Sequence, residues 1–209
     1  CGFDLASASG IELGFDERAA ARNMAEFLGT THHEIVLKSG DMERALPADF
    51  ALERSRSRLA RLAGYEVLIE VEQGGEVFPE TLRFSAAGGL DYRVEQPRVG
   101  AETLRRLLLG DYPALFRELS LDPRRRSLDH LEGWPCLVLG AQAGELAQPQ
   151  LWLDQETFFP VRLAVGGREL TLRDLRSPQT RGVFPRLIEL REGGRLSWRA
   201  QTLRVRPLP

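Results

Sequence analysis

The sequence predicts an α+β protein built on a curved antiparallel β-sheet, a half-barrel with an N-terminal helix and a helical lid, preceded by a short strand-helix-strand fragment. From residue 65 onward, apolar and polar residues alternate with the period of two that is typical of half-buried strands. Pairs of glycines separate these stretches, as in hairpin turns, at 74–75, 88–89, 166–167 and 193–194. Helical periodicity occurs at 16–29, 52–63, 102–109 and 111–119.

The first 47 residues differ from the rest of the chain. In the helix predicted at 16–29, Asp16 is a suitable N-cap and Gly29 a suitable C-terminal stop, and HHEIVLK (32–38) then predicts a short strand. Residues 1–47 hold eight acidic and four basic side chains, whereas the whole chain of 209 residues has a net charge of only -2. This step in composition predicts a boundary near Pro47. We expect 1–47 not to be an independent domain, because it offers too little apolar surface to fold alone, and 50–209 to form the half-barrel domain.

One face of the predicted sheet is apolar. In YEVLIEVEQ, for example, Val67 and Ile69 point to one side while Glu66 and Glu70 point to the other. Two interpretations of the apolar face stay open: it encloses a ligand, or the helices at 52–63 and 102–119 fill it with side chains. The candidates for lining a ligand cavity are Val67, Ile69, Leu82, Phe84, Leu151, Leu153 and Phe159.

The residues give no sign of catalysis. His32 and His33 are neighbours on a predicted strand, so they point to opposite faces and cannot easily bind one metal ion. Cys136 lies in the apolar stretch WPCLVLGA, where a cysteine is usually inert filling. No GxSxG, P-loop or GxGxxG motif occurs in the sequence. We therefore expect no catalytic residue, no metal site and no cofactor, and the small net charge argues against nucleic acid as a partner.

Residues 1–47 resemble part of the synthetase domain of asparagine-synthetase-type amidotransferases, most closely the branch associated with exosortase systems. The resemblance rests on Gly2-Phe3, Phe15-Asp16-Glu17, Leu28-Gly29-Thr30, His32-His33-Glu34 and residues 41–47. It implies a strand, a helix and a strand from a fold that activates a carboxylate with ATP. The pyrophosphate loop SGGxDS and the acidic loop SGEGxDE of that family do not occur in this sequence, and Cys1 does not match the family's N-terminal cysteine. The histidine pair is thus interpreted as part of a fragment of a larger enzyme.

Residues 50–207 resemble the periplasmic lipoprotein-carrier superfamily, which includes LolA-like and LolB-like proteins. The similarity is carried by ALERSRSRLARLAGYEVLIEV, by PQLWLDQETFFPVRL with its D-x-x-T turn, and by FPRLIELREGGRLSW. It implies an acyl-chain cavity between a curved sheet and lidding helices, the periplasm or outer membrane as location, and outer-membrane lipoprotein sorting as the process.

Three functions follow as hypotheses. The first is a non-catalytic envelope protein that binds a lipid or lipoprotein acyl chain, with another envelope protein as a possible further partner. The second is the remnant of an ATP-dependent, glutamine-hydrolysing amidotransferase. The third is a structural or assembly protein without a ligand. The chain lacks an initiator methionine and a signal peptide, so we expect it to be a mature form or a fragment.

Overall fold

The computed structural model describes residues 2–3, 18–33, 36–37, 47–96, 98–142, 144–145 and 147–208. Two compact units make up the chain, Cys1–Pro47 and Ala48–Pro209.

The first unit contains a strand, a helix and a strand, as the sequence predicts. Strands β1 (Gly2–Phe3) and β2 (Val36–Leu37) pair in parallel, and helix α1 (Arg18–Leu28) lies between them in the sequence. Gly29 ends α1 with a positive φ of 63°, a conformation that glycine adopts without strain. Asp16, the predicted N-cap, lies outside the described residues. The strand predicted at 32–38 is shorter than expected, because His32 and His33 belong to a loop.

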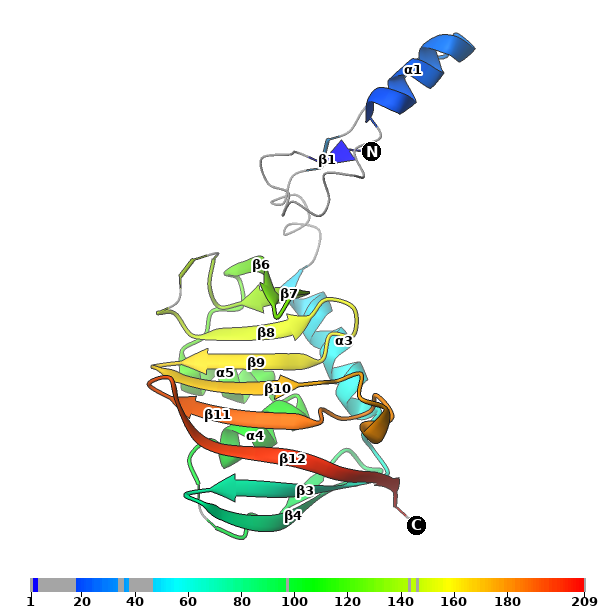
Figure 1. Ribbon diagram of the computed structural model, residues 1–209. Helices are drawn as coiled ribbons and strands as arrows, with labels where there is room; N and C mark the ends of the chain where they lie inside the picture. Colours follow the sequence, from blue (N-terminus) through cyan, green and yellow to red (C-terminus); the bar gives the residue numbers. More distant parts are fainter. Residues whose placement is uncertain are drawn as a thin grey trace. The chain divides into compact units, whose positions relative to one another are not determined.

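The described residues of the second unit form one antiparallel sheet of ten strands with three α-helices (Figure 1). The order of the strands is β5-β4-β3-β12-β11-β10-β9-β8-β7-β6. Adjacent strands are consecutive in the sequence except β3 and β12, and the consecutive strands β5 and β6 lie at the two opposite edges of the sheet. The strands are β3 (Tyr65–Gln73), β4 (Glu76–Phe84), β5 (Leu90–Tyr92), β6 (Arg126–Leu131), β7 (Trp134–Leu139), β8 (Gln150–Asp154), β9 (Pro160–Val165), β10 (Arg168–Arg173), β11 (Leu187–Glu192) and β12 (Arg195–Pro207).

The helices are α3 (Ala48–Ala60), α4 (Ala101–Leu109) and α5 (Tyr112–Leu119), with a short 3-10 helix, η2, at Pro178–Thr180. The predicted fold class is therefore confirmed: the protein is α+β, with an open antiparallel sheet, a preceding helix and a helical pair. Helix α3 begins four residues before the predicted start at 52, directly after Pro47. The exposed Asp49 and Phe50 in its first turn do not fit the buried stripe on which the prediction relied.

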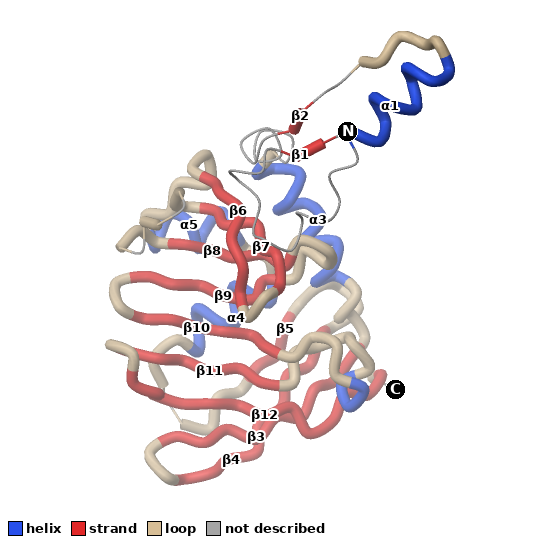
Figure 2. Tube along the Cα trace, turned by 45° about the horizontal axis from the view of Figure 1, so that its top comes forward, coloured by secondary structure: helices blue, strands red, loops and turns tan. Residues whose placement is uncertain are grey.

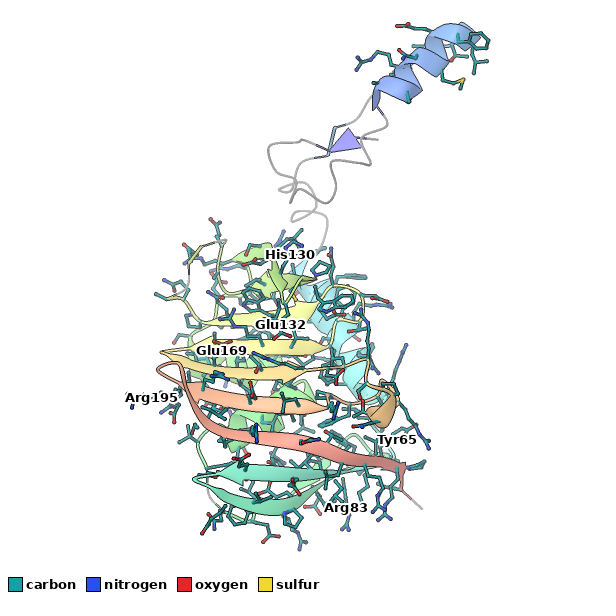
Figure 3. The ribbon with its side chains drawn as sticks, in the orientation of Figure 1. Tyr65, Arg83, His130, Glu132, Glu169 and Arg195 are labelled. Atoms are coloured by element: carbon teal, nitrogen blue, oxygen red, sulfur yellow. The ribbon has the colours of Figure 1, made fainter. Side chains whose placement is uncertain are left out.

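All three helices cover the same face of the sheet, which Figure 1 shows with the helices behind the strands. Side chains from this face and from the helices form one continuous apolar core. It includes Trp198, Tyr112 and Phe184, which are all fully buried. The opposite face carries mainly charged side chains (Figure 3) together with a small apolar cluster of Cys136, Val138, Trp152 and Val161. We call these the helix-covered face and the outer face.

A buried ion pair anchors the connection between β5 and α4. Arg98 lies in this connection, and its guanidinium binds the carboxylate of Glu80 in β4 through two hydrogen bonds, one of them 2.5 Å long between Nη1 and Oε1. Both side chains are 0% exposed. Glu80 also accepts hydrogen bonds from the Tyr92 hydroxyl (3.0 Å) and from the backbone N–H of Glu95 (3.1 Å). Beside this pair, the Trp198 indole donates to the carbonyl of Val99 at 2.8 Å. The connection is thus held by charge-assisted hydrogen bonds inside the protein.

A second acidic residue links three strands on the outer face. Glu66 in β3 accepts hydrogen bonds from Arg83 Nε in β4 (2.9 Å) and from Arg206 Nε in β12 (2.8 Å). These two bonds, that of Arg83 first, hold the pKa of Glu66 below its usual value. The carboxylate therefore favours the folded state whenever it is ionised.

We expect Glu66→Gln to lower the free energy of unfolding at neutral pH. Because the folded-state pKa of Glu66 is lowered, its contribution is complete above the ordinary pKa of a glutamate, about 4.3, and is lost as the pH falls through the lower, folded value. The difference in stability between wild type and variant should accordingly be constant from pH 7 to about pH 5. Below the ordinary glutamate pKa it should shrink. Urea unfolding across this range checks the result, and a difference that grows toward acid would contradict it.

Candidate ligand-binding site

The β6–β7 hairpin folds back across the outer face of the sheet. Its two-residue turn consists of Glu132 and Gly133, both with positive φ (55° and 85°), as in the tight turns that join twisted strands. The Glu132 carboxylate lies 2.9 Å from Nη1 of Arg173 in β10. Strands β7 and β10 are three positions apart in the sheet, roughly 14 Å at the usual spacing. The tip of the hairpin must therefore bend over β8 and β9 to reach Arg173 (Figure 2).

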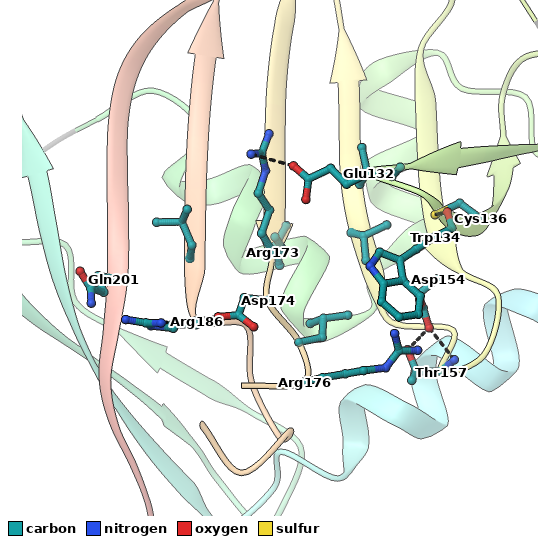
Figure 4. A pocket seen from close by; sticks show the side chains of 15 residues that line it. Glu132, Trp134, Cys136, Asp154, Thr157, Arg173, Asp174, Arg176, Arg186 and Gln201 are labelled. Atoms are coloured by element: carbon teal, nitrogen blue, oxygen red, sulfur yellow. Dashed lines mark hydrogen bonds and ion pairs between the residues drawn. The ribbon is translucent and has the colours of Figure 1, made fainter. Parts of the chain in front are cut away.

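A pocket of about 580 Å³ opens on the outer face beside this hairpin (Figure 4). Its volume is within the usual range for small-molecule sites. Seven of the lining residues are apolar, and most of the others are ionisable. The residues that line it are Leu131, Glu132, Trp134, Cys136, Asp154, Thr157, Val161, Leu172, Arg173, Asp174, Leu175, Arg176, Arg186, Leu187 and Gln201.

The β8–β9 turn forms one side of the pocket. Asp154 accepts hydrogen bonds from both the backbone N–H (2.8 Å) and the hydroxyl (2.7 Å) of Thr157. A second pair of backbone bonds closes the turn, since Phe158 donates to the carbonyl of Asp154 and Asp154 donates to that of Phe159. This is the D-x-x-T turn that the sequence predicts. The Oδ1 atom of Asp154 thus holds the turn in place, and the turn defines the shape of this side of the pocket.

Trp134 and Arg176 form a stacked pair at the mouth. The Arg176 guanidinium carbon lies 4.0 Å from the centroid of the Trp134 ring, within the range of a cation–π contact. Arg176 also forms an ion pair with Glu156. Even so, Trp134 is 54% exposed. A large aromatic side chain is thus held in place at the pocket while most of its surface still faces solvent.

Two other arginines in the pocket have hydrogen-bonding capacity to spare. Nη1 of Arg186 lies 3.8 Å from the nearer carboxylate oxygen of Asp174, which is an ion pair but too long for a hydrogen bond. Nε of Arg173 is buried and has no hydrogen-bond partner among the described residues. A buried N–H without an acceptor is costly, and the Nη1 of the same guanidinium lies 2.9 Å from the Glu132 carboxylate.

The free thiol of Cys136 lies in the wall of the pocket. Burial raises its pKa to about 11, and the carboxylates of Asp154 and Asp129 add to the effect. The thiol is therefore protonated at neutral pH and a poor nucleophile. The side chain is 1% exposed and lies in β7, within the apolar stretch WPCLVLGA of the sequence.

The seven residues predicted from the sequence lie elsewhere, on the helix-covered face. All belong to the continuous apolar core and all are buried: Val67, Ile69, Leu82, Phe84, Leu151, Leu153 and Phe159. None of them lines the outer-face pocket. Their role in binding a ligand stays a prediction. The alternating pattern of the strands does not identify the pocket residues, because many of them lie in turns. The available signal was the cluster of arginines, Arg173, Arg176 and Arg186, at both ends of the β10–β11 connection.

In the described part of the chain, no group of three or more His, Cys, Asp or Glu side chains is arranged to hold a metal ion. None of the helices in the same residues has the length and apolar character that a membrane span requires.

A family of sequences matches the N-terminal part of the chain. The asparagine synthase family model matches residues 2–77, which include all but the first residue of the stretch 1–47 whose sequence resembles that family. The match passes the boundary at Pro47 and continues through α3 and β3 into β4. It covers less than half of the chain. No curated protein matches the chain in sequence.

Solved structures resemble the second unit. A LolA superfamily protein from Nitrosomonas europaea has a TM-score of 0.44 at 11% identity, with coverage of 78% of this chain and 94% of that one. A DUF1329 family protein from Desulfovibrio piger has a TM-score of 0.42 at 10% sequence identity, and the match covers 77% of this chain and 93% of that one. A putative outer membrane lipoprotein-sorting protein domain from Vibrio parahaemolyticus has a TM-score of 0.37 at 15% identity, with the same coverage of 77% and 93%. These proteins are of the class that residues 50–207 resemble in sequence.

Proposed function

We propose that this protein is a non-catalytic component of the cell envelope, located in the periplasm or at the outer membrane, that binds the acyl chain of a lipid or lipoprotein. The resemblance of residues 50–207 to lipoprotein carriers supports both the location and the ligand class. A second envelope protein, which delivers or receives the ligand, is the partner that such a role requires.

The observation that carries the proposal is the continuous apolar face of the sheet beneath two short helices. Helices α4 and α5 have nine and eight residues, which is shorter than a helix needs to be stable alone. Gly100, the N-cap of α4, makes no side-chain capping bond. The pair is therefore held mainly by its contacts with the core, and it is the part of the cover that a chain-like apolar ligand displaces at least cost. The ligand then lies against the seven predicted residues, with Ile69 and Leu153 among them.

A substitution on this face tests the proposal. Ala200 in β12 is buried in the core opposite Val71 and Ile188, so Ala200→Leu fills space that the acyl chain would use. Burial of each methylene of an acyl chain contributes about 0.8 kcal/mol, so displacing two of them should lower the affinity for an uncharged acyl probe, such as a fluorescent fatty-acid ester, at least about fivefold. Probe fluorescence is measured at a temperature where circular dichroism shows both proteins to be folded.

Arg199→Leu is the matched control, because Arg199 is the preceding residue of β12 and pairs with Glu72 on the outer face. It should bind the probe as wild type does. Native mass spectrometry of protein from a bacterial host provides the second measurement, with a retained lipid mass as the expected result. A protein that retains no lipid and does not bind the probe would refute the proposed function.

A further inference from the structure

We propose that the outer-face pocket is a second, separate binding site, which takes a single-chain amphiphile with an oxyanion head group. It does not rest on the function proposed above, because it lies on the opposite side of the sheet. The site is already open in this structure, whereas the helix-covered face is packed.

The apolar residues of the pocket would bind the alkyl chain of the amphiphile. Leu131 and Leu175 pack against the small cluster of the outer face that contains Cys136 and Val161. Together with Leu187 and Trp134 they present an apolar surface within a concave space of about 580 Å³. Burial of an alkyl chain there removes apolar surface from water, which stabilises the complex. The exposed ring of Trp134 gains most from being covered.

Two arginines of the pocket would bind the oxyanion head group. Arg173 and Arg186 come from neighbouring strands, at the end of β10 and just before β11, and the backbone N–H of Arg186 donates to the Arg173 carbonyl at 3.1 Å. Among the described residues, Nε of Arg173 has no hydrogen-bond partner, and Nη1 of Arg186 lies 3.8 Å from a carboxylate oxygen of Asp174. A carboxylate or phosphate accepts two parallel hydrogen bonds from a guanidinium group. Asp174, at 3.8 Å from Arg186, opposes this by competing for the same donors.

Titration calorimetry measures the binding of two anionic amphiphiles, dodecanoate and dodecyl phosphate. Dodecanol, which lacks the charge, and inorganic phosphate, which lacks the alkyl chain, are the controls. Either anionic amphiphile should bind at least about tenfold more tightly than dodecanol, since a hydrogen bond to a charged group contributes this much. Inorganic phosphate should bind weakly. If dodecanol binds as tightly as both anions, or inorganic phosphate binds as tightly as dodecyl phosphate, the assignment is overturned.

Variants of the rim locate the site. Arg186→Gln should weaken binding of the anionic amphiphile at least about tenfold. Asp174→Asn should strengthen it, a gain that misfolding cannot produce. Arg195→Gln, which removes the same charge at the far end of the β11–β12 hairpin (Figure 3), should have no effect. Unchanged affinity in Arg186→Gln refutes the site.

The two binding sites are separable by the same measurements. The effect of Arg186→Gln on dodecanoate binding should be the same with Ala200 or Leu at position 200, and Arg186→Gln should leave binding of the uncharged probe unchanged. Loss of dodecanoate binding in Ala200→Leu alone would place the anion on the helix-covered face and end the proposal of a second site, without touching the proposed function.

Discussion

Replacing Arg98 by methionine is expected to cost about 3–5 kcal/mol of the free energy of unfolding, because it leaves the buried carboxylate of Glu80 without its counter-ion. Burial alone would lower the pKa of Arg98, but the hydrogen bonds to Glu80 and the nearby charges outweigh it and raise that pKa. The guanidinium is therefore charged at every pH at which the protein folds. Urea unfolding followed by circular dichroism measures the loss.

Two variants show whether the loss comes from an unpaired buried charge. Arg93→Met removes an arginine from the same connection, but its side chain is 89% exposed and lies 3.7 Å from Asp91; we expect a change below about 1 kcal/mol. In the double variant Glu80→Leu/Arg98→Met no charge is left behind, so most of the stability should return. A double variant as unstable as Arg98→Met would contradict this explanation.

The second large effect is expected for Gly140→Ala, at the residue that follows β7. Gly140 has a φ of 101°, and a β-carbon built there would lie 2.2 Å from the carbonyl oxygen of Pro149 and 2.7 Å from a side-chain carbon of Leu121. The positive φ costs about 1–2 kcal/mol for an alanine, and the overpacking adds about 1–3 kcal/mol. Because the 2.2 Å contact is with backbone, side-chain motion does not relieve it. Thermal unfolding should show a large fall in Tm.

Gly133→Ala separates the two contributions. Gly133 also has a positive φ, 85°, but nothing lies within 4 Å of the position of its β-carbon. This variant should carry the cost of the backbone conformation only, about 1–2 kcal/mol. Equal stability of the two alanine variants would contradict the close contact between Gly140 and the carbonyl oxygen of Pro149, the residue before β8.

The sequence predicts the sheet well because its signal is local. Strand β3 alternates between buried valine or isoleucine and outward glutamate, and Gly74-Gly75 supplies the positive φ of the following turn. Each such segment can be identified without knowledge of its neighbours. The 3-10 helix η2 was missed because its position depends on tertiary contacts, such as the hydrogen bond from Arg58 in α3 to the carbonyl of Gly182 (2.7 Å).

The candidate site is less predictable for a different physical reason. Periodicity identifies the face to which Leu151 or Phe159 points, but it does not show whether helices fill the space in front of that face. The outer-face pocket depends on the direction in which the β6–β7 hairpin bends. That bend is recorded in the contact between Glu132 and Arg173, two residues far apart in the sequence.

The place of β12 has a consequence for the order of folding. This last strand lies between β3 and β11, so it alone bridges the β3–β5 meander and the β6–β11 meander. During synthesis, β3 and β11 therefore each have one unpaired edge until the residues of β12 have left the ribosome. Loops closed over such long sequence separations slow folding, and a chain truncated before β12 would present two additional sticky edges to other molecules.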